Sequence, residues 1–333
     1  MKRFLYLLLA ITTICSSSFA LAMRKVTVIR PNTTPIKIGV ILPIEHQAMT
    51  EITRGFTQTL AKQYPHHPIA LFIRNASGDI NLQRAIIEEL RTKHVNLFVP
   101  VSTNTTLMTL AMIQNTPIVS IASEYTEAQR KHRQPCNITS VNDSIPPKPQ
   151  LEFMKSVIPN LKQLTIVHSA SDKVIQQVKQ FSALAKKMNI SVQDLMVQQL
   201  SDLYPIASKI SHKSQLIFIF KDNLVASGIR TLVQAANYKK IPLVTSDDGT
   251  VENGAAFAIG VPEYQLGLLG AQLAIQVLQG KNPCDLPIRR IKQLTLFINP
   301  SALMRQNGPS IRQIQLLAKK NRYKTMIVAH LKG

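Results

Sequence analysis

The stretch IKIGVILPIEHQAMTEITRGFTQTLAKQYPHHPIALFI, residues 36–73, predicts the class of fold. Its apolar run from Ile36 to Leu42 is typical of a buried strand. Ile52, Phe56 and Leu60 then repeat at helical spacing, and the run Ile69 to Ile73 is a second strand. A strand, a helix and another strand in this order favour a parallel βαβ unit.

The same alternation continues on both sides of a polar, basic stretch at residues 126–135. Before it we expect strands at 97–100 and 117–121 and helices at 82–90 and up to about 114. After it we expect strands at 137–141, 164–168, 191–197, 216–220 and 241–245, separated by helices. The pattern predicts two doubly wound, Rossmann-like α/β lobes with a boundary at the basic stretch. Ligands of such sheets bind beyond the carboxyl ends of the strands, so a cleft between the lobes is the expected site.

Composition supports a large folded chain with an unusual charge. The chain has 333 residues, of which 45% are hydrophobic and 17% charged, so a sizeable core is expected and disorder is not. It has 39 Lys and Arg against 18 Asp and Glu. The basic residues are scattered, with the densest runs at 130–133 and 319–324, and no nucleic-acid-binding motif accompanies them. A basic solvated surface is therefore favoured over a nucleic-acid partner.

The amino terminus has the pattern of a cleavable signal peptide over residues 1–22. Lys2 and Arg3 precede an apolar run, Phe4 to Ile14, and Ala20-Leu21-Ala22 forms an A-x-A cleavage site. The alternative is an uncleaved membrane anchor, and a lipoprotein is disfavoured because Ile14 before Cys15 is not small. We therefore expect a periplasmic protein. Cys136 and Cys284 would remain after cleavage, either as one disulfide or as two free thiols.

Polar side chains follow several strands of the first lobe. Thr103 and Thr105 stand where a helix begins, so they could bind an anion such as a carboxylate, although Thr103 could simply cap the helix. Glu124, beside Ser123, could hold an ammonium group or be a solvated acid. His46 is a plausible polar contact or a capping residue. Tyr125, in the same loop as Glu124, could stack on a ring.

Acidic residues follow strands of the second lobe. Asp222 and Asp247 could pair with an amine, although Asp247 could instead cap the next helix. His168 also follows a strand. The sequence has no Gly-x-Ser-x-Gly elbow, zinc motif or phosphate loop, so we expect a binding protein that is not an enzyme and needs no cofactor.

Six stretches in register resemble the substrate-binding proteins of ABC transporters associated with tryptophan and tyrosine uptake. They are KIGVILPIEHQAM (37–49), NITSVND (137–143), KDNLVASG (221–228), SDDGTVENGA (246–255), LQGKNPCDLPI (278–288) and FINPSALMRQNGPSI (297–311). The segment at 246–255 is similar to the family's S-D-E-x-x-V-x-x-G-A and is followed by Tyr264 and Gly267. The resemblance covers about Ile36 to Ala318.

The resemblance implies the type I periplasmic-binding fold, with three crossings between lobes near Pro135, residues 251–254 and Leu286. The first lobe would hold residues 36–134 plus 254–283, and the second 136–253 plus 284–333. Cys136 and Cys284 would then flank the hinge. The implied partners are a small-molecule ligand and an ABC permease in the cytoplasmic membrane, with the protein itself a monomer.

Departures from the family pattern lie around the expected ligand. The H-P-A-L-D segment reads His46-Gln47-Ala48-Met49-Thr50, and the glutamine of T-x-A-A-Q is Leu107. The resemblance therefore does not imply one named solute. We expect an amino acid or a related zwitterion, because hydroxyl side chains (Thr103, Thr105 and Ser123) lie in one lobe and acids (Asp222 and Asp247) in the other. A periplasmic sensor that passes its liganded state to a membrane partner is the alternative role.

Overall fold

A computed structural model of the chain describes residues 34–65 and 68–328. The signal peptide expected at residues 1–22 lies outside these residues. In the described part, no helix is both long and apolar enough to cross a membrane.

The first sheet has six strands in the order β11-β5-β4-β3-β1-β2, all parallel to their neighbours. Its strands are β1 (Ile36–Leu42), β2 (Ile69–Asn75), β3 (Leu97–Pro100), β4 (Ile118–Ile121), β5 (Ile138–Asn142) and β11 (Arg289–Arg290). The apolar runs predicted as strands are therefore the centre of this sheet, where both faces are covered.

The second sheet has seven strands in the order β13-β12-β10-β9-β8-β6-β7. They are β6 (Gln163–Ser169), β7 (Ser191–Val197), β8 (Ile217–Phe218), β9 (Leu243–Thr245), β10 (Phe257–Gly260), β12 (Thr295–Ile298) and β13 (Lys324–Ile327). All pairs are parallel except β10 with β12. The prediction of two α/β lobes with parallel sheets is confirmed.

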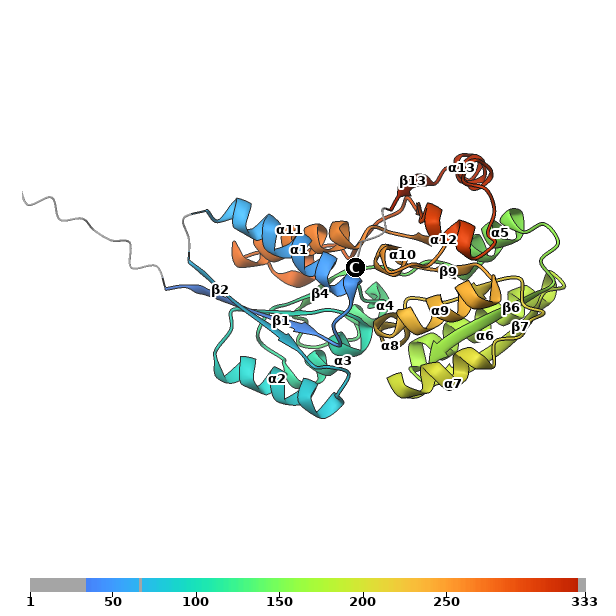
Figure 1. Ribbon diagram of the computed structural model, residues 1–333. Coiled ribbons are helices and arrows are strands. Elements are labelled where there is room, and N and C mark those ends of the chain that lie inside the picture. The colour runs from blue at the N-terminus through green and yellow to red at the C-terminus, as the bar shows by residue number, and fades with distance from the viewer. Residues whose placement is uncertain (1–33, 66–67, 329–333) are drawn as a thin grey trace, which may run out of the picture. The chain divides into compact units, whose positions relative to one another are not determined.

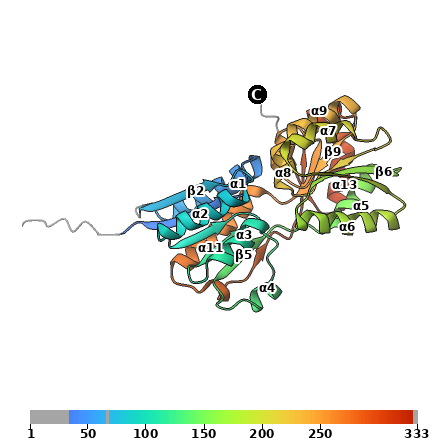
Figure 2. The same ribbon diagram turned by 90° about the horizontal axis from the view of Figure 1, so that it is seen from below.

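Helices cover both faces of each sheet (Figure 1). On the first sheet, α1 (Gln47–Gln63) and α11 (Glu263–Leu278) lie side by side on one face, and α2 (Ile80–Thr92) and α3 (Thr103–Met112) cover the other. Figure 2 shows the second sheet between α7 (Leu203–Ser208), α8 (Asn223–Ser227) and α9 (Ile229–Lys239) above and α5 (Pro147–Val157) and α6 (Asp172–Lys187) below. The remaining helices are α4 (Glu127–Lys131), η1 (Leu200–Asp202), α10 (Asp248–Glu252), η2 (Pro283–Asp285), α12 (Pro300–Arg305) and α13 (Ile311–Lys320).

Helices α1 and α11 approach closely because each presents a glycine to the other. A Cβ added to Gly267 would lie 1.9 Å from the carbonyl oxygen of Ile52, and one added to Gly55 would lie 2.1 Å from that of Tyr264. No side chain fits at either distance. This contact joins the segment after residue 260 to the first lobe.

The crossings between the lobes come later in the chain than the sequence analysis expected. Strand β5 pairs with β4, so the stretch at 126–135 connects two strands of one sheet rather than two lobes. The chain leaves the first sheet after Asn142, returns after Gly260 because β10 belongs to the second sheet, and leaves again after Arg290. The boundaries expected at 134–136, 251–254 and 284–286 are therefore wrong, since strand pairing and not local polarity sets them.

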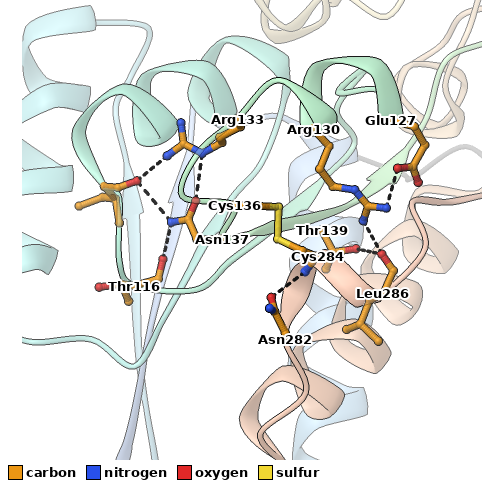
Figure 3. Close-up of a disulfide and its surroundings, with 11 residues drawn as sticks. Thr116, Glu127, Arg130, Arg133, Cys136, Asn137, Thr139, Asn282, Cys284 and Leu286 are labelled. Atoms are coloured by element: carbon orange, nitrogen blue, oxygen red, sulfur yellow. Dashed lines mark hydrogen bonds and ion pairs between the residues drawn. A yellow bond between two sulfur atoms is a disulfide. The ribbon is translucent and has the colours of Figure 1, made fainter.

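A disulfide joins Cys136 and Cys284, whose Cα atoms are 6.1 Å apart, but it is not at the hinge (Figure 3). Cys136 precedes β5, so it lies at the amino end of that strand, whereas the chain crosses to the second lobe beyond the carboxyl end. Nearby, Arg130 donates to the carbonyl of Leu286 and pairs with Glu127. Part of the basic run at 130–133 thus holds the first lobe together.

Candidate functional site

A cavity of about 660 Å³ lies between the carboxyl ends of the two sets of parallel strands. The first lobe lines it with residues that follow β1, β3 and β4, and the second with residues that follow β6, β8 and β9. This is where open α/β sheets bind ligands, and the volume falls within the roughly 300–1,000 Å³ of small-molecule sites. The expected interlobe cleft is therefore present.

The charged residues that line the cleft are mostly acidic, although the chain as a whole is strongly basic. Six carboxylates line it, against two lysines. The carboxylates are Asp79, Asp143, Asp172, Asp222, Asp247 and Glu263, and the lysines are Lys173 and Lys221. With 39 basic and 18 acidic residues in the chain, this local excess of negative charge favours a ligand that carries positive charge.

A buried ion cluster forms the part of the cleft nearest the crossings. The ammonium of Lys221 lies 2.6 Å from Glu263 Oε1 and 3.3 Å from Asp143 Oδ2. Lys221 follows β8 of the second lobe, whereas Asp143 follows β5 and Glu263 begins α11. The side chains of both acids are at most 5% exposed. Lys221 thus joins the segments on which the chain leaves and re-enters the first lobe.

Burial and neighbouring charge shift the pKa values of this cluster in opposite directions. Burial would raise the pKa of Asp143, but the charges of Lys221 and Lys173 outweigh it and lower that pKa. Burial, opposed by Lys221 but reinforced by Asp248 and Asp247, raises the pKa of Glu263 to about 8. Burial and the charge of Asp247 raise the pKa of Asp248 to about 7. The Oδ1 atoms of Asp143 and Asp248 are buried without a hydrogen-bond partner among the described residues.

Asp222 and Asp247 both line the cleft, and both cap helices. Asp222 accepts hydrogen bonds from the N–H groups of Leu224 and Val225 through Oδ1, and from Ser169 N–H at 2.5 Å through Oδ2. Asp247 Oδ1 accepts from Thr250 N–H at 2.8 Å. Its second oxygen has no hydrogen-bond donor in the described part of the chain, so Asp247 combines capping with an acceptor left over for a ligand.

His46 lies in the cleft at the start of α1. Its Nε2 is 3.2 Å from Asn223 Oδ1, a contact that joins the two lobes. Burial lowers the pKa of His46, although the charge of Asp247 partly opposes this shift. The ring is therefore uncharged near neutral pH, and it adds no positive charge to the acidic lining.

The hydroxyl residues expected to bind a carboxylate divide into two groups. Thr103 lines the cleft at the start of α3, together with Ser102, which the sequence pattern did not single out. Thr105 is buried beneath them and donates to Gln83 Oε1 at 3.2 Å, and Ser123 accepts from Tyr125 N–H. Thr105 and Ser123 are absent from the lining, so their expected contact with a ligand is not supported.

Three further candidates make contacts within the protein instead of lining the cavity. Glu124 lies 3.5 Å from the ammonium of Lys173 and accepts from Gln177 Nε2 at 2.7 Å, which joins the lobes. Tyr125 packs in the core that the first sheet forms with α2 and α3. His168 is 3% exposed and bonds Asp194 through Nε2. Their positions at strand ends predict that these residues lie near the edge of the cleft, but they do not predict which way each side chain points.

The family model of ABC transporter substrate binding proteins matches residues 37–320. The chain belongs to this family. An uncharacterized protein of Rickettsia prowazekii is 33% identical over 320 residues, which cover 96% of this chain and 95% of that protein. The tyrosine-binding protein of Clostridioides difficile is 25% identical over 273 residues, 80% of this chain and 79% of the relative.

Solved structures share the fold of this substrate-binding protein. An ABC domain from Streptococcus pneumonia in complex with L-Trp aligns with a TM-score of 0.78 at 23% identity, covering 88% of this chain and 100% of that one. A conserved domain protein from Vibrio cholerae aligns with a TM-score of 0.79 at 23% identity, covering 88% and 99%. These matches confirm the type I periplasmic-binding architecture.

Sequence reasoning missed Lys221, Glu263 and Asp143 as cleft residues of this substrate-binding protein. A signal was present, because Lys221 directly follows the apolar run 216–220 and Asp143 follows the strand at 138–142. Their pairing could not be read from the sequence, because it joins segments separated by 42 residues or more. Over residues 34–65 and 68–328, no group of three or more His, Cys, Asp or Glu side chains is arranged so that it could hold a metal ion.

Proposed function

We propose that this substrate-binding protein captures a small solute bearing a protonated amine, outside the cytoplasmic membrane, and delivers it to an ABC importer. The observation that carries the proposal is the acidic lining of the cleft in a basic chain, with one oxygen of Asp247 left without a protein donor. An ammonium group placed there would gain a charge-assisted hydrogen bond.

The opposite wall supports a zwitterion. Ser102 is the N-cap of α3 and Thr103 is its first residue; the helix has ten residues, and its first N–H groups have no intrahelical acceptor. Positive potential at such a helix start favours a carboxylate. An amino acid would thus direct its carboxylate to the first lobe and its ammonium to Asp247 in the second.

Apolar side chains in the same cleft support a solute with an apolar body. Ile80 and Leu107, both of the first lobe, are 63% and 45% exposed and line the cavity. Covering them with a ligand would remove apolar surface from water. Tryptophan and tyrosine, which the names of two similar proteins mention, combine an amine, a carboxylate and an apolar body.

The direct test is the identity of the solute that co-purifies with the natively released protein. Mass spectrometry of the intact complex, followed by analysis of the released solute, should give a compound with a basic nitrogen and a mass compatible with a cavity of about 660 Å³. A sugar or an anion without a basic nitrogen would contradict the proposal.

A further inference from the structure

The last part of the chain is basic without any acidic residue. From Leu286 to Gly333 the sequence holds ten Lys and Arg and no Asp or Glu. Five of them lie on α13, on β13 or on the short connection between them. These are Arg312, Lys319, Lys320, Arg322 and Lys324, and all are exposed. We call the surface of residues 311–327 the C-terminal face; α13 and β13 are labelled in Figure 1.

The five cations of the C-terminal face have no partner within the described chain. None of their side chains forms an ion pair or a hydrogen bond with a residue of 34–65 or 68–328. By contrast, Arg54, Arg74 and Arg91 each pair with a glutamate. Glu152 of the neighbouring α5 is paired with Lys148 instead. The positive charge of this face therefore remains uncompensated.

An exposed leucine lies among these cations on α13. Ile314 and Ala318 are fully buried, so they mark the inner side of the helix. Leu316 points the other way and is 60% exposed. It is four residues from Arg312 and from Lys320, and three from Lys319, so it shares the outer face with them. On β13, Ile327 is 53% exposed three residues after Lys324.

An apolar residue ringed by long cationic side chains is the pattern of helices that lie in a membrane interface. We propose that the C-terminal face docks the protein on anionic phospholipid headgroups, with the cations at the phosphates and Leu316 in the headgroup layer. Aliphatic Leu316 and Ile327 favour a bilayer over nucleic acid, because single strands are bound through aromatic stacking. Lys324 on the edge strand disfavours pairing with a second copy.

Docking by this face leaves the cleft accessible. Strand β13 is the edge of the second sheet farthest from β6 and β7, and none of the five cations lines the cavity. The protein can therefore bind solute and lipid at the same time.

The test is co-sedimentation of the full chain with vesicles of phosphatidylcholine alone or mixed with phosphatidylglycerol, at low and at physiological salt. Arg312→Glu, Lys319→Glu and Lys320→Glu together should weaken binding to the anionic vesicles at least tenfold, and Leu316→Ser should weaken it severalfold. The matched controls are Lys62→Glu, Lys131→Glu and Lys213→Glu together, and Tyr204→Ser, which change exposed residues elsewhere. All variants share one amino terminus, so any difference reports on the face.

Thermal denaturation of each variant checks that it is folded. The proposal is supported if the parent binds the anionic vesicles but not vesicles of phosphatidylcholine alone. The triple variant should then lose binding to the anionic vesicles, and the control variants should keep it. Equal binding to both vesicle types, or a triple variant that binds like the parent, would overturn it. Binding to duplex DNA in the absence of any vesicle binding would also overturn it and assign the face to nucleic acid.

Discussion

The ammonium of Lys221 lies 2.6 Å from the carboxylate of Glu263, and this bond connects the second lobe to the first residue of α11. Lys221 also pairs with Asp143, where the chain first leaves the first lobe. Opening or closing of the cleft must therefore preserve or rearrange a buried ion cluster.

We expect Lys221→Met to destabilise the protein by about 3–5 kcal/mol, because it leaves the buried carboxylate of Asp143 without its cation and removes the ammonium donor from Glu263. Combining it with Asp143→Asn should restore part of the loss, since the unpaired buried charge is then removed. Urea denaturation measures the free energy of unfolding of the single and the double variant, and Lys131→Met, at an exposed position, is the control. A loss below about 1 kcal/mol for Lys221→Met would show that the cluster is not stabilising.

Stability should fall as the pH rises through neutrality. Asp248 has a pKa near 7 in the fold against 3.8 ordinarily, so the folded chain binds more protons than the unfolded chain between these values. The contribution of Asp248 to the free energy of unfolding is fully present below about pH 4 and is lost as the pH rises through 7. Glu263 contributes with the same sign, and its contribution is lost as the pH rises through about 8. Each unit of pKa shift corresponds to about 1.4 kcal/mol.

Asp248→Asn should flatten this pH dependence, because asparagine does not titrate. Denaturation curves recorded between about pH 5 and pH 8 provide the measurement. Asp285→Asn, at an exposed position in η2, should leave the slope as in the parent. An unchanged slope in Asp248→Asn would exclude Asp248 as its source.

Removing the disulfide should cost stability but not affinity. The Cys136–Cys284 bond closes a segment of 148 residues, which in the chain-entropy model corresponds to about 5 kcal/mol. Cys136→Ser with Cys284→Ser should therefore unfold at lower urea. Solute affinity should stay within about twofold, because the bond lies at the amino ends of the strands and away from the cleft; a tenfold loss would place it in the binding machinery.

Export should remove the first 22 residues. The A-x-A site at Ala20-Leu21-Ala22 predicts that the mature protein begins at Met23. Amino-terminal sequencing of the protein recovered from the periplasm measures this directly. A membrane-bound chain that keeps Met1 would contradict the prediction.

The sequence was sufficient for the fold because strand and helix periodicities are local. The apolar runs of β1, β6 and β9 each match a strand of the structure. The lobe to which a strand belongs cannot be predicted from local sequence. Strand β5 belongs to the first sheet because it pairs with β4, and the residues at 126–135 give no indication of that pairing. Polarity marked a surface loop there, not a boundary.

The candidate site was predicted only in part, because strand ends are a local feature of the sequence and side-chain partners are not. The carboxyl ends of strands identified Asp222, Asp247, His46 and Thr103, all of which line the cleft. Thr105 and Ser123 share that position in sequence but point into the core, and Glu124 is held by Lys173 of the other lobe. The direction of a side chain after a strand depends on backbone geometry and partners that come together only in the folded chain.

The central claim is that the cleft binds a protonated amine at Asp247, and calorimetry with paired solutes tests it most directly. Amino acids that raise the thermal midpoint of the parent are each compared with their N-acetyl derivatives, in the parent and in Asp247→Asn. This change keeps Oδ1 as the cap of Thr250 N–H and removes the charge. We predict a loss of at least tenfold in affinity, about 1.4 kcal/mol, both on acetylation and in Asp247→Asn, whereas Asp285→Asn binds like the parent. Equal affinity for the amine and its acetylated form, or unchanged binding by Asp247→Asn, would contradict the account.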